Sequence, residues 1–294
     1  MTESSSYRPE PGAPNHARSP DGVQAAWRDR VFWGAMVAVC TGYVVMLIAL
    51  VLADIVFLTA PSAASDPQQE ESVFVAALKD PDIRYAVRLT LVSCTITAIL
   101  SAAVAVPIGY LLSRNSFRGK SVVDTILDIP IVLPPLVIGL SLLILFQSMP
   151  EALRRAVVYQ VPAVILAQFV VASAFAIRVM RGTFDQIDPR REQVALTLGA
   201  SRFQAFGRVV LPEANSGLVA ALLLAWARAF GEFGPLLVFA GATRGKTEVL
   251  STTVFLELSV GDVRSAVAVS LLMVVTSLAV LTLVRAASGR RVGL

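Results

Sequence analysis

Residues 192–212 read EQVALTLGASRFQAFGRVVLP, a polar and basic stretch between two long hydrophobic runs. Its apolar residues recur at roughly the spacing of one helix face: Val194, Leu198, Phe203, Phe206 and Val210. Gly199 interrupts this pattern, Ser201 suits the N-cap of a second helix, and Pro212 predicts where that helix ends. The stretch therefore predicts two short helices joined by a glycine turn, a rigid projection at a membrane surface that another protein can bind.

This stretch resembles the cytoplasmic loop of inner-membrane permeases of binding-protein-dependent ABC importers. Their pattern is Glu-Ala-Ala, three residues, Gly, nine residues, an aliphatic residue, one residue and Leu-Pro. Here nine residues separate Gly199 from Val209, and Leu211-Pro212 follows at the family spacing, but Gln193-Val194-Ala195 replaces the opening triplet and Glu192 stands one place early. The resemblance implies that these residues couple the chain to an ATPase: Glu192, Gln193, Ala195, Gly199, Ala200, Leu211 and Pro212. The alternative is an ordinary amphipathic loop helix.

The composition is typical of a polytopic membrane protein. Of the 294 residues, 55% are hydrophobic, and the mean hydropathy is +0.70. We attribute the net charge of +4 to basic cytoplasmic loops, which orient membrane proteins, and expect no nucleic-acid partner. The only histidine, His16, lies in a polar tail, and Cys40 and Cys94 have no metal or redox spacing. The sequence therefore predicts neither a metal site nor catalytic residues.

Six hydrophobic runs predict an all-α transmembrane bundle of six spans, formed by residues 31–285. The runs are residues 31–58, 89–112, 126–146, 161–177, 218–242 and 265–284. Residues 1–30, rich in Pro, Ser and charge, predict a disordered tail, and residues 286–294 a second, short tail. Most of the 25 Lys and Arg residues fall on the side of both tails and of residues 192–212, which predicts that this side is cytoplasmic. Loops are expected on the opposite side at residues 59–88, 147–160 and 243–264.

Residues 128–135 read DIPIVLPP and place three prolines within six positions of the third run. A regular helix does not accommodate them, because each proline removes a backbone donor and clashes with the preceding turn. One interpretation is a packing kink at a helix end. The other is the wall of a translocation path, because non-helical backbone at membrane depth is tolerated where it lines a cavity. The stretch resembles one in molybdate and sulfate permeases, and that resemblance implies a path that includes Pro134 and Pro135.

Arg228 and Glu232 are the charges within the fifth run. A charge at the centre of a span costs at least ~2.5–3.5 kcal/mol, so such residues usually face a bundle interior or a water-filled cavity. Arg228 lies about 15 Å into the run at ~1.5 Å per residue, and Glu232 follows at i+4, where the two can pair. They are either a self-neutralising structural pair or a cationic station for an anion, with Glu232 holding the arginine.

Residues 228–234, RAFGEFG, resemble the Arg-Ala-x-Gly-Glu-Phe-Gly stretch of permeases for molybdate, tungstate and sulfate. The likeness extends over most of the chain from the second to the sixth run. It implies a fold of the type I ABC importer permease kind and ATP-driven import of a tetrahedral oxyanion, molybdate first, then tungstate or sulfate. The implied partners are a second copy of the chain, cytoplasmic ATP-binding subunits, an extracytoplasmic substrate-binding protein and the lipid of the inner membrane.

Residues 241–247, GATRGKT, do not form a phosphate-binding loop, because that motif needs four residues between its glycines and this stretch has three. We therefore expect ATP on a partner subunit, no cofactor in this chain, and no enzymatic activity of its own. One rival is an ion-coupled secondary transporter of a small anion, which would need intramembrane acidic or histidine relays. Only Asp54, Asp128 and Glu232 are available for that role. A membrane enzyme is the other rival, but no nucleophile–histidine pair supports it.

Overall fold

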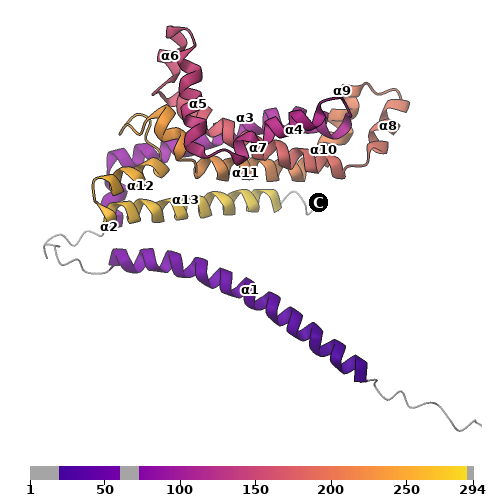
Figure 1. Ribbon diagram of the computed structural model, residues 1–294, viewed down its shortest axis with the longest axis horizontal. Helices are drawn as coiled ribbons and strands as arrows, with labels where there is room; N and C mark the ends of the chain where they lie inside the picture. Colours follow the sequence, from indigo (N-terminus) through magenta and orange to yellow (C-terminus); the bar gives the residue numbers. More distant parts are fainter. Residues whose placement is uncertain (1–19, 60–72, 290–294) are drawn as a thin grey trace, which may run out of the picture. The chain divides into compact units, whose positions relative to one another are not determined.

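The structure is a computed structural model that describes residues 20–59 and 73–289. Within these ranges all regular elements are helical, as Figure 1 shows, and no described residue forms a strand. The chain divides into two compact units, Met1–Ile55 and Val56–Leu294. The predicted all-α fold is therefore confirmed.

The first long helix, α1, spans Pro20–Thr59. Its segment Arg30–Thr59 has the length and hydropathy of a membrane span, as the first hydrophobic run predicts. The helix begins eleven residues before the predicted span, inside the stretch that we expected to be a disordered tail. Proline is favourable at a first helical position, where its missing N–H has no intrahelical partner. The rest of the predicted tail lies outside the described residues.

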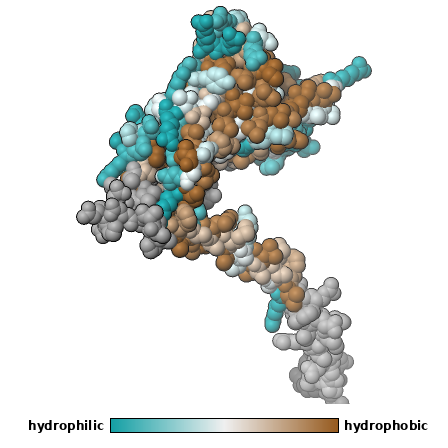
Figure 2. Space-filling view, turned by 60° about the vertical axis from the view of Figure 1, so that its left-hand side comes forward, coloured by the Kyte–Doolittle hydropathy of each residue, from teal (hydrophilic) through white to brown (hydrophobic). Residues whose placement is uncertain are grey.

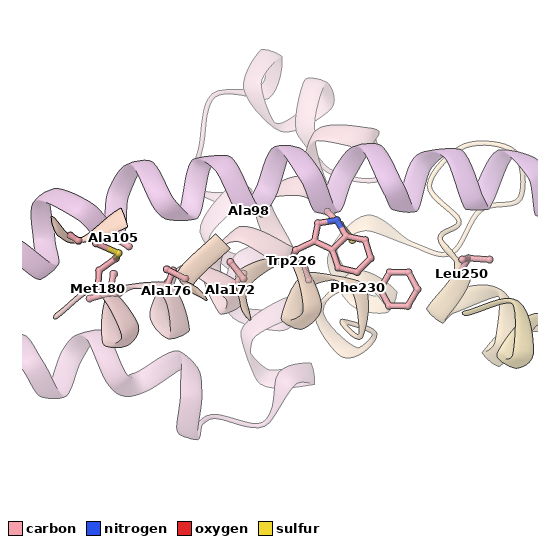
Figure 3. Close-up of a cluster of buried hydrophobic side chains, with 14 of the residues drawn as sticks. Ala98, Ala105, Ala172, Ala176, Met180, Trp226, Phe230 and Leu250 are labelled. Carbon is pink, nitrogen blue, oxygen red and sulfur yellow. The ribbon is translucent and has the colours of Figure 1, made fainter. Parts of the chain in front are cut away.

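Three long helices form the centre of the second unit: α3 (Pro81–Arg114), α7 (Val161–Gln186) and α11 (Asn215–Phe230). Figure 3 shows their contact, where alanines of α3 and α7 lie beside Met180, Trp226 and Phe230. Small residues let helix backbones approach closely in a membrane. At Gly217 a Cβ atom would lie 2.0 Å from Thr183 Oγ1. Close packing of α7 against α11 therefore requires glycine at this position.

The other long helix, α13 (Val263–Gly289), lies alongside this core and contacts α11. Figure 2 shows hydrophobic side chains gathered over the body of the unit, with hydrophilic ones toward its edges. Four described helices are long and apolar enough to cross a membrane, and up to six spans result if each of two bent pairs is one span. The six predicted spans correspond to this upper count.

The first bent pair is α4 (Lys120–Val132) and α5 (Pro135–Gln147), whose axes differ by 110°. The break falls at Leu133 and Pro134, so the prediction that these prolines interrupt the third span is confirmed. Pro130 does not fit this prediction. It lies inside α4, where we expected no regular helix.

The second bent pair differs more from the prediction. A helix over Arg202–Glu213 precedes α11 and meets it at 71°, and α11 ends at Phe230, not at residue 242. Gly231 is the C-cap of α11. Pro235, four residues later, is a second helix breaker, and a short π-helix, η2 (Leu236–Ala240), follows it.

The predicted loops also contain helices. These are α2 (Val73–Lys79), α6 (Glu151–Val157) and α12 (Leu250–Ser259). In addition, α3 starts at Pro81, eight residues before the second predicted span, because Asp80 caps it by accepting a hydrogen bond from the Asp82 amide. The helix α7 likewise continues nine residues beyond the predicted end of span four.

Candidate functional site

The stretch at residues 192–212 forms a chain of short helices at one end of the unit (Figure 1). These are α8 (Pro189–Thr197), α9 (Arg202–Ala205), the π-helix η1 (Phe206–Val210) and α10 (Leu211–Glu213). The predicted glycine turn lies between α8 and α9, where Gly199 has a φ of +88°, a conformation that favours glycine. Ser201 and Gln204 form a capping box, which confirms the predicted N-cap.

The second helix ends within one residue of Pro212, as predicted. The helix Arg202–Glu213 contains Pro212 in its last turn, directly after the π-helix η1, and the chain bends at Ala214. Of the predicted coupling residues, Glu192, Gln193 and Ala195 lie in α8, Gly199 and Ala200 in the turn, and Leu211 and Pro212 in α10.

The predicted apolar stripe divides into an anchored part and a free part. Val210 is fully buried and Phe206 is partly buried against the core. In contrast, Leu198 is 83% exposed and Phe203 is 84% exposed. The projection therefore has an apolar tip that nothing in the second unit covers.

Glu192 is held within the chain by α3. The Tyr110 hydroxyl donates a hydrogen bond to Glu192 Oε1, and Arg114 Nε lies 3.6 Å from Glu192 Oε2. Arg114 also donates from Nη2 to the Ile187 carbonyl at 2.9 Å. The side chains of Arg114 and Glu192 are only 12% and 14% exposed. We call Tyr110, Arg114 and Glu192 the Glu192 cluster, and sequence reasoning missed its two α3 members.

Aromatic packing joins the Glu192 cluster to the core. The Tyr110 ring meets Phe184 and Phe206 edge to face, with centroids 5.6 Å and 4.7 Å away. An open cavity of about 840 Å³ lies beside the cluster, lined also by Gln193 and Phe203. The projection is thus fixed to α3 and α7 at its base while its tip is exposed.

The second group of predicted site residues lies at the other end of α11. Arg228 is in the last turn of this helix, and its Nη1 lies 2.5 Å from Glu232 Oε2. The predicted pairing is therefore confirmed, although Glu232 follows the helix end and does not continue the helix. Glu232 is 1% exposed and Arg228 is 27% exposed, so the carboxylate is enclosed while the guanidinium is partly accessible.

Phe175 of α7 is a further contact of Arg228. The Arg228 guanidinium carbon lies 5.7 Å from the centroid of this ring, within the range of a cation–π interaction. In addition, Gln168 Nε2 donates to the Ala229 carbonyl at 3.3 Å, and Ser251 Oγ donates to the Glu232 carbonyl at 2.7 Å. The end of α11 is thus held by both α7 and α12.

The predicted path prolines lie next to this pair. A Cβ atom at Gly234 would lie 2.9 Å from Pro135 Cβ, and one at Gly139 would lie 2.7 Å from Pro235 Cα. Glycine at both positions therefore lets the backbone of α5 touch the backbone that follows α11. The structure brings Pro134, Pro135, Arg228 and Glu232 into one region, and it places the coupling residues elsewhere, at the other end of α11.

Among the described residues, no three His, Cys, Asp or Glu side chains are grouped so that they could hold a metal ion. The two candidate regions thus offer an exposed apolar projection and a partly accessible arginine, backed by a buried carboxylate. The first suits binding of a protein, and the second suits contact with an anion.

The family match and the similar proteins agree on one family of transport proteins. Residues 105–293 match the family described as the binding-protein-dependent transport system inner membrane component. The molybdate/tungstate transport system permease protein WtpB of Pyrococcus abyssi is 38% identical over 168 residues, which cover 57% of this chain and 65% of that protein. The sulfate transport system permease protein CysT of Escherichia coli is 32% identical over 210 residues, covering 69% of this chain and 76% of that protein.

Solved structures share the fold. A bacterial ABC transporter involved in the import of the acidic polysaccharide alginate aligns with a TM-score of 0.69 at 18% identity, over 92% of this chain and 100% of that one. The bacterial alginate ABC transporter in complex with an alginate pentasaccharide-bound periplasmic protein aligns equally well, with a TM-score of 0.69. This likeness shows that the chain has the fold of an ABC importer permease.

Proposed function

The chain belongs to the family of inner membrane components of binding-protein-dependent transport systems, and on this basis we propose that it is the permease subunit of an ATP-driven importer of a tetrahedral oxyanion. The observation that carries the proposal is Arg228, a partly exposed cation within an apolar bundle. Relatives named for molybdate, tungstate and sulfate support the substrate class, with molybdate first.

ATP coupling suits such a cargo energetically. Moving one charge through 100 mV is worth about 2.3 kcal/mol, so importing a dianion against an inside-negative potential costs roughly 4–5 kcal/mol. A passive pore would lose the ion. The alternative of an ion-coupled secondary transporter is not favoured, because the family match is to ATP-dependent importers.

In the proposed assembly, two copies of the chain enclose the path, and a cytoplasmic ATP-binding subunit docks on each projection. The exposed tip at Leu198 and Phe203 gives that subunit an apolar surface to cover. An extracytoplasmic binding protein delivers the ion, as the periplasmic partner of the alginate transporter supports. Closure of the ATPases moves the projections and switches the path between inward and outward access. Both termini lie on the ATPase side of the inner membrane.

Reconstitution tests the proposal. The permease is placed in proteoliposomes with its ATPase and binding protein, and uptake of radiolabelled molybdate, tungstate and sulfate is measured with and without ATP. We expect ATP-dependent uptake of at least one of the three, and molybdate at the highest rate. Absence of ATP-dependent uptake of all three, from a complex that hydrolyses ATP, would contradict the oxyanion assignment.

A further inference from the structure

A second accessible arginine lies on the same face of α7 that carries Phe175. Arg178 follows Phe175 at i+3, so the two side chains are neighbours on one helix face. Because Arg228 lies over the Phe175 ring, Arg178 comes about 4.5 Å further along the axis of α7, at ~1.5 Å per residue. This displacement leads from the α12 end of the bundle toward the projection.

Arg178 directly follows the predicted fourth span, residues 161–177, in the part of α7 that continues toward the projection. It lies eight residues before the end of α7, about 12 Å from that end, and its side chain is 58% exposed. A guanidinium at the end of a span can reach water and stay accessible to an anion. The neighbouring position on this face, Gly182, also has open space where a side chain would lie.

The partner of Arg178 leaves most of its guanidinium free. Arg178 Nη2 donates a hydrogen bond to Asp128 Oδ2 of α4, and no other partner is found for this side chain among the described residues. A guanidinium has five N–H donors, so several remain for an anion. Asp128 itself is 33% exposed and lies in α4, the first half of the bent span that breaks at Leu133 and Pro134.

Arg181, one turn further on, provides a contrast. Its Nη1 lies 2.5 Å from Asp124 Oδ1, and its Nε lies 3.8 Å from Asp185 Oδ2. Two carboxylates therefore engage this guanidinium, and its side chain is only 28% exposed. Arg181 joins α4 to α7 as Arg178 does, but it offers an anion less charge and less access.

We propose that Arg178 is a second cationic station for the oxyanion, reached after Arg228 on the way to the cytoplasm, and that Asp128 holds its side chain in place. This inference rests on the proposed function and extends it to a residue on another helix. Each arginine is backed by one carboxylate, so each can exchange part of that contact for the anion without leaving an isolated charge. Two stations one helical turn apart shorten the step that a dehydrated dianion makes between favourable contacts.

The test uses the complete complex in proteoliposomes with molybdate as the probe. Arg178→Gln is expected to lower the uptake rate about tenfold, and Arg178→Lys, which keeps the charge, to retain most of it. Asp128→Asn breaks the same ion pair but keeps the arginine, and it is expected to retain at least about half of the rate. Arg178→Gln/Asp128→Asn is expected to stay as slow as Arg178→Gln.

Arg181→Gln is the matched control, because it removes a second ion pair between the same two helices. We expect uptake by this variant to stay near that of the unmodified complex. If Arg178 only clamps α4 to α7, Arg178→Gln and Asp128→Asn will be equally slow and the double variant will recover, which overturns the inference. Uptake in all variants is normalised to assembled complex, measured by co-purification of the ATPase.

The two proposals can fail separately. If the unmodified complex imports none of molybdate, tungstate and sulfate, the proposed function fails and the station fails with it. If molybdate is imported and Arg178→Gln leaves the uptake rate unchanged, Arg178 is not a station for the anion. The proposed function as an oxyanion importer is then unaffected.

Discussion

At the scale of single residues, the Arg228–Glu232 pair sets the clearest test of substrate contact. Glu232 is 1% exposed, so Arg228→Ala leaves a buried carboxylate without its cation, a change that costs about 3–5 kcal/mol. We expect this variant to insert and to bind its ATPase, but to melt at a lower temperature in detergent. Its molybdate uptake is expected to fall about tenfold or more.

Arg228→Ala/Glu232→Ala separates the two interpretations of the pair. Removing both charges takes away the buried unpaired carboxylate, so the melting temperature is expected to recover under either interpretation. If Arg228 contacts the anion, uptake stays low in the stable double variant. Full recovery of uptake would show that the pair is only structural.

The Glu192 cluster makes a different prediction, about the base of the projection. Tyr110→Phe removes a hydrogen bond to a charged acceptor, which is worth about 1.5–3 kcal/mol, but keeps the ring that packs on Phe184 and Phe206. We expect a lower melting temperature and fewer ions imported per ATP hydrolysed. Tyr159→Phe is the control, because Tyr159 is half exposed on a different part of the chain. An unchanged ratio of uptake to hydrolysis in Tyr110→Phe would argue against the cluster as a positioning device.

At the scale of elements, the turn between α8 and α9 tests the proposed docking of the ATPase. The φ of +88° at Gly199 is tolerated by aspartate better than by most residues, and nothing lies within 4 Å of the Cβ position. Gly199→Asp should therefore fold and insert, but place a charge beside the exposed apolar tip. We expect loss of ATPase co-purification, with Gly207→Ala, at an open position on η1, as the control.

Gln193→Glu should leave co-purification intact, since it restores the residue of the family pattern. Normal substrate-stimulated ATP hydrolysis by the Gly199→Asp complex would contradict docking of the ATPase at this turn.

The start of α13 offers a prediction about pH. Asp262 accepts hydrogen bonds from the Ser265 amide at 3.0 Å and the Ser265 hydroxyl at 2.7 Å, and these bonds lower the pKa of Asp262. A lowered folded-state pKa means that the stabilisation is present above the unfolded pKa of ~3.9 and is lost as the pH falls through the folded value. Asp262→Ala should cost about 1 kcal/mol at pH 7. The difference in melting temperature from the unmodified protein should shrink below pH ~4, and a constant difference would contradict the cap.

Much of the element pattern was predictable from the sequence, because hydrophobic runs and proline or glycine signals are local. The broken third span, the Gly199 turn and the Ser201 cap follow from such signals. The helices α2, α6 and α12 were missed, since helices of seven to ten residues lack a long apolar run. The end of the second helix near Pro212 was also predictable, because proline removes a backbone donor.

The site contacts that the sequence did not predict join segments that are far apart in the chain. The pairing of Arg228 with Glu232 was predictable from their i+4 spacing. Tyr110 and Glu192 are 82 positions apart, and no local pattern links them. Arg178 likewise meets Asp128, and Phe175 meets Arg228, only through the packing of α4 and α11 on α7.

At the scale of the whole molecule, the distribution of basic residues predicts the orientation in the membrane. Reporter tags at the N- and C-termini should both lie in the cytoplasm, and cysteines placed within residues 59–88 should react with an impermeant reagent added outside. An even number of spans requires both termini on one side. Opposite locations for the two tags would rule out six spans.

The glycine contacts between α5 and the segment after α11 have a mechanical consequence. Gly139 sits on Pro235 and Gly234 on Pro135, backbone against backbone, with no flexible side chain between them that could yield. Such close contact favours movement of these two segments together, as one rigid body. Flexing is left to the hinges that flank them, at Leu133-Pro134 on one side and Ala214 on the other. Ala214 joins the projection to α11, so a movement of the projection reaches the Arg228 end of α11 through this bend.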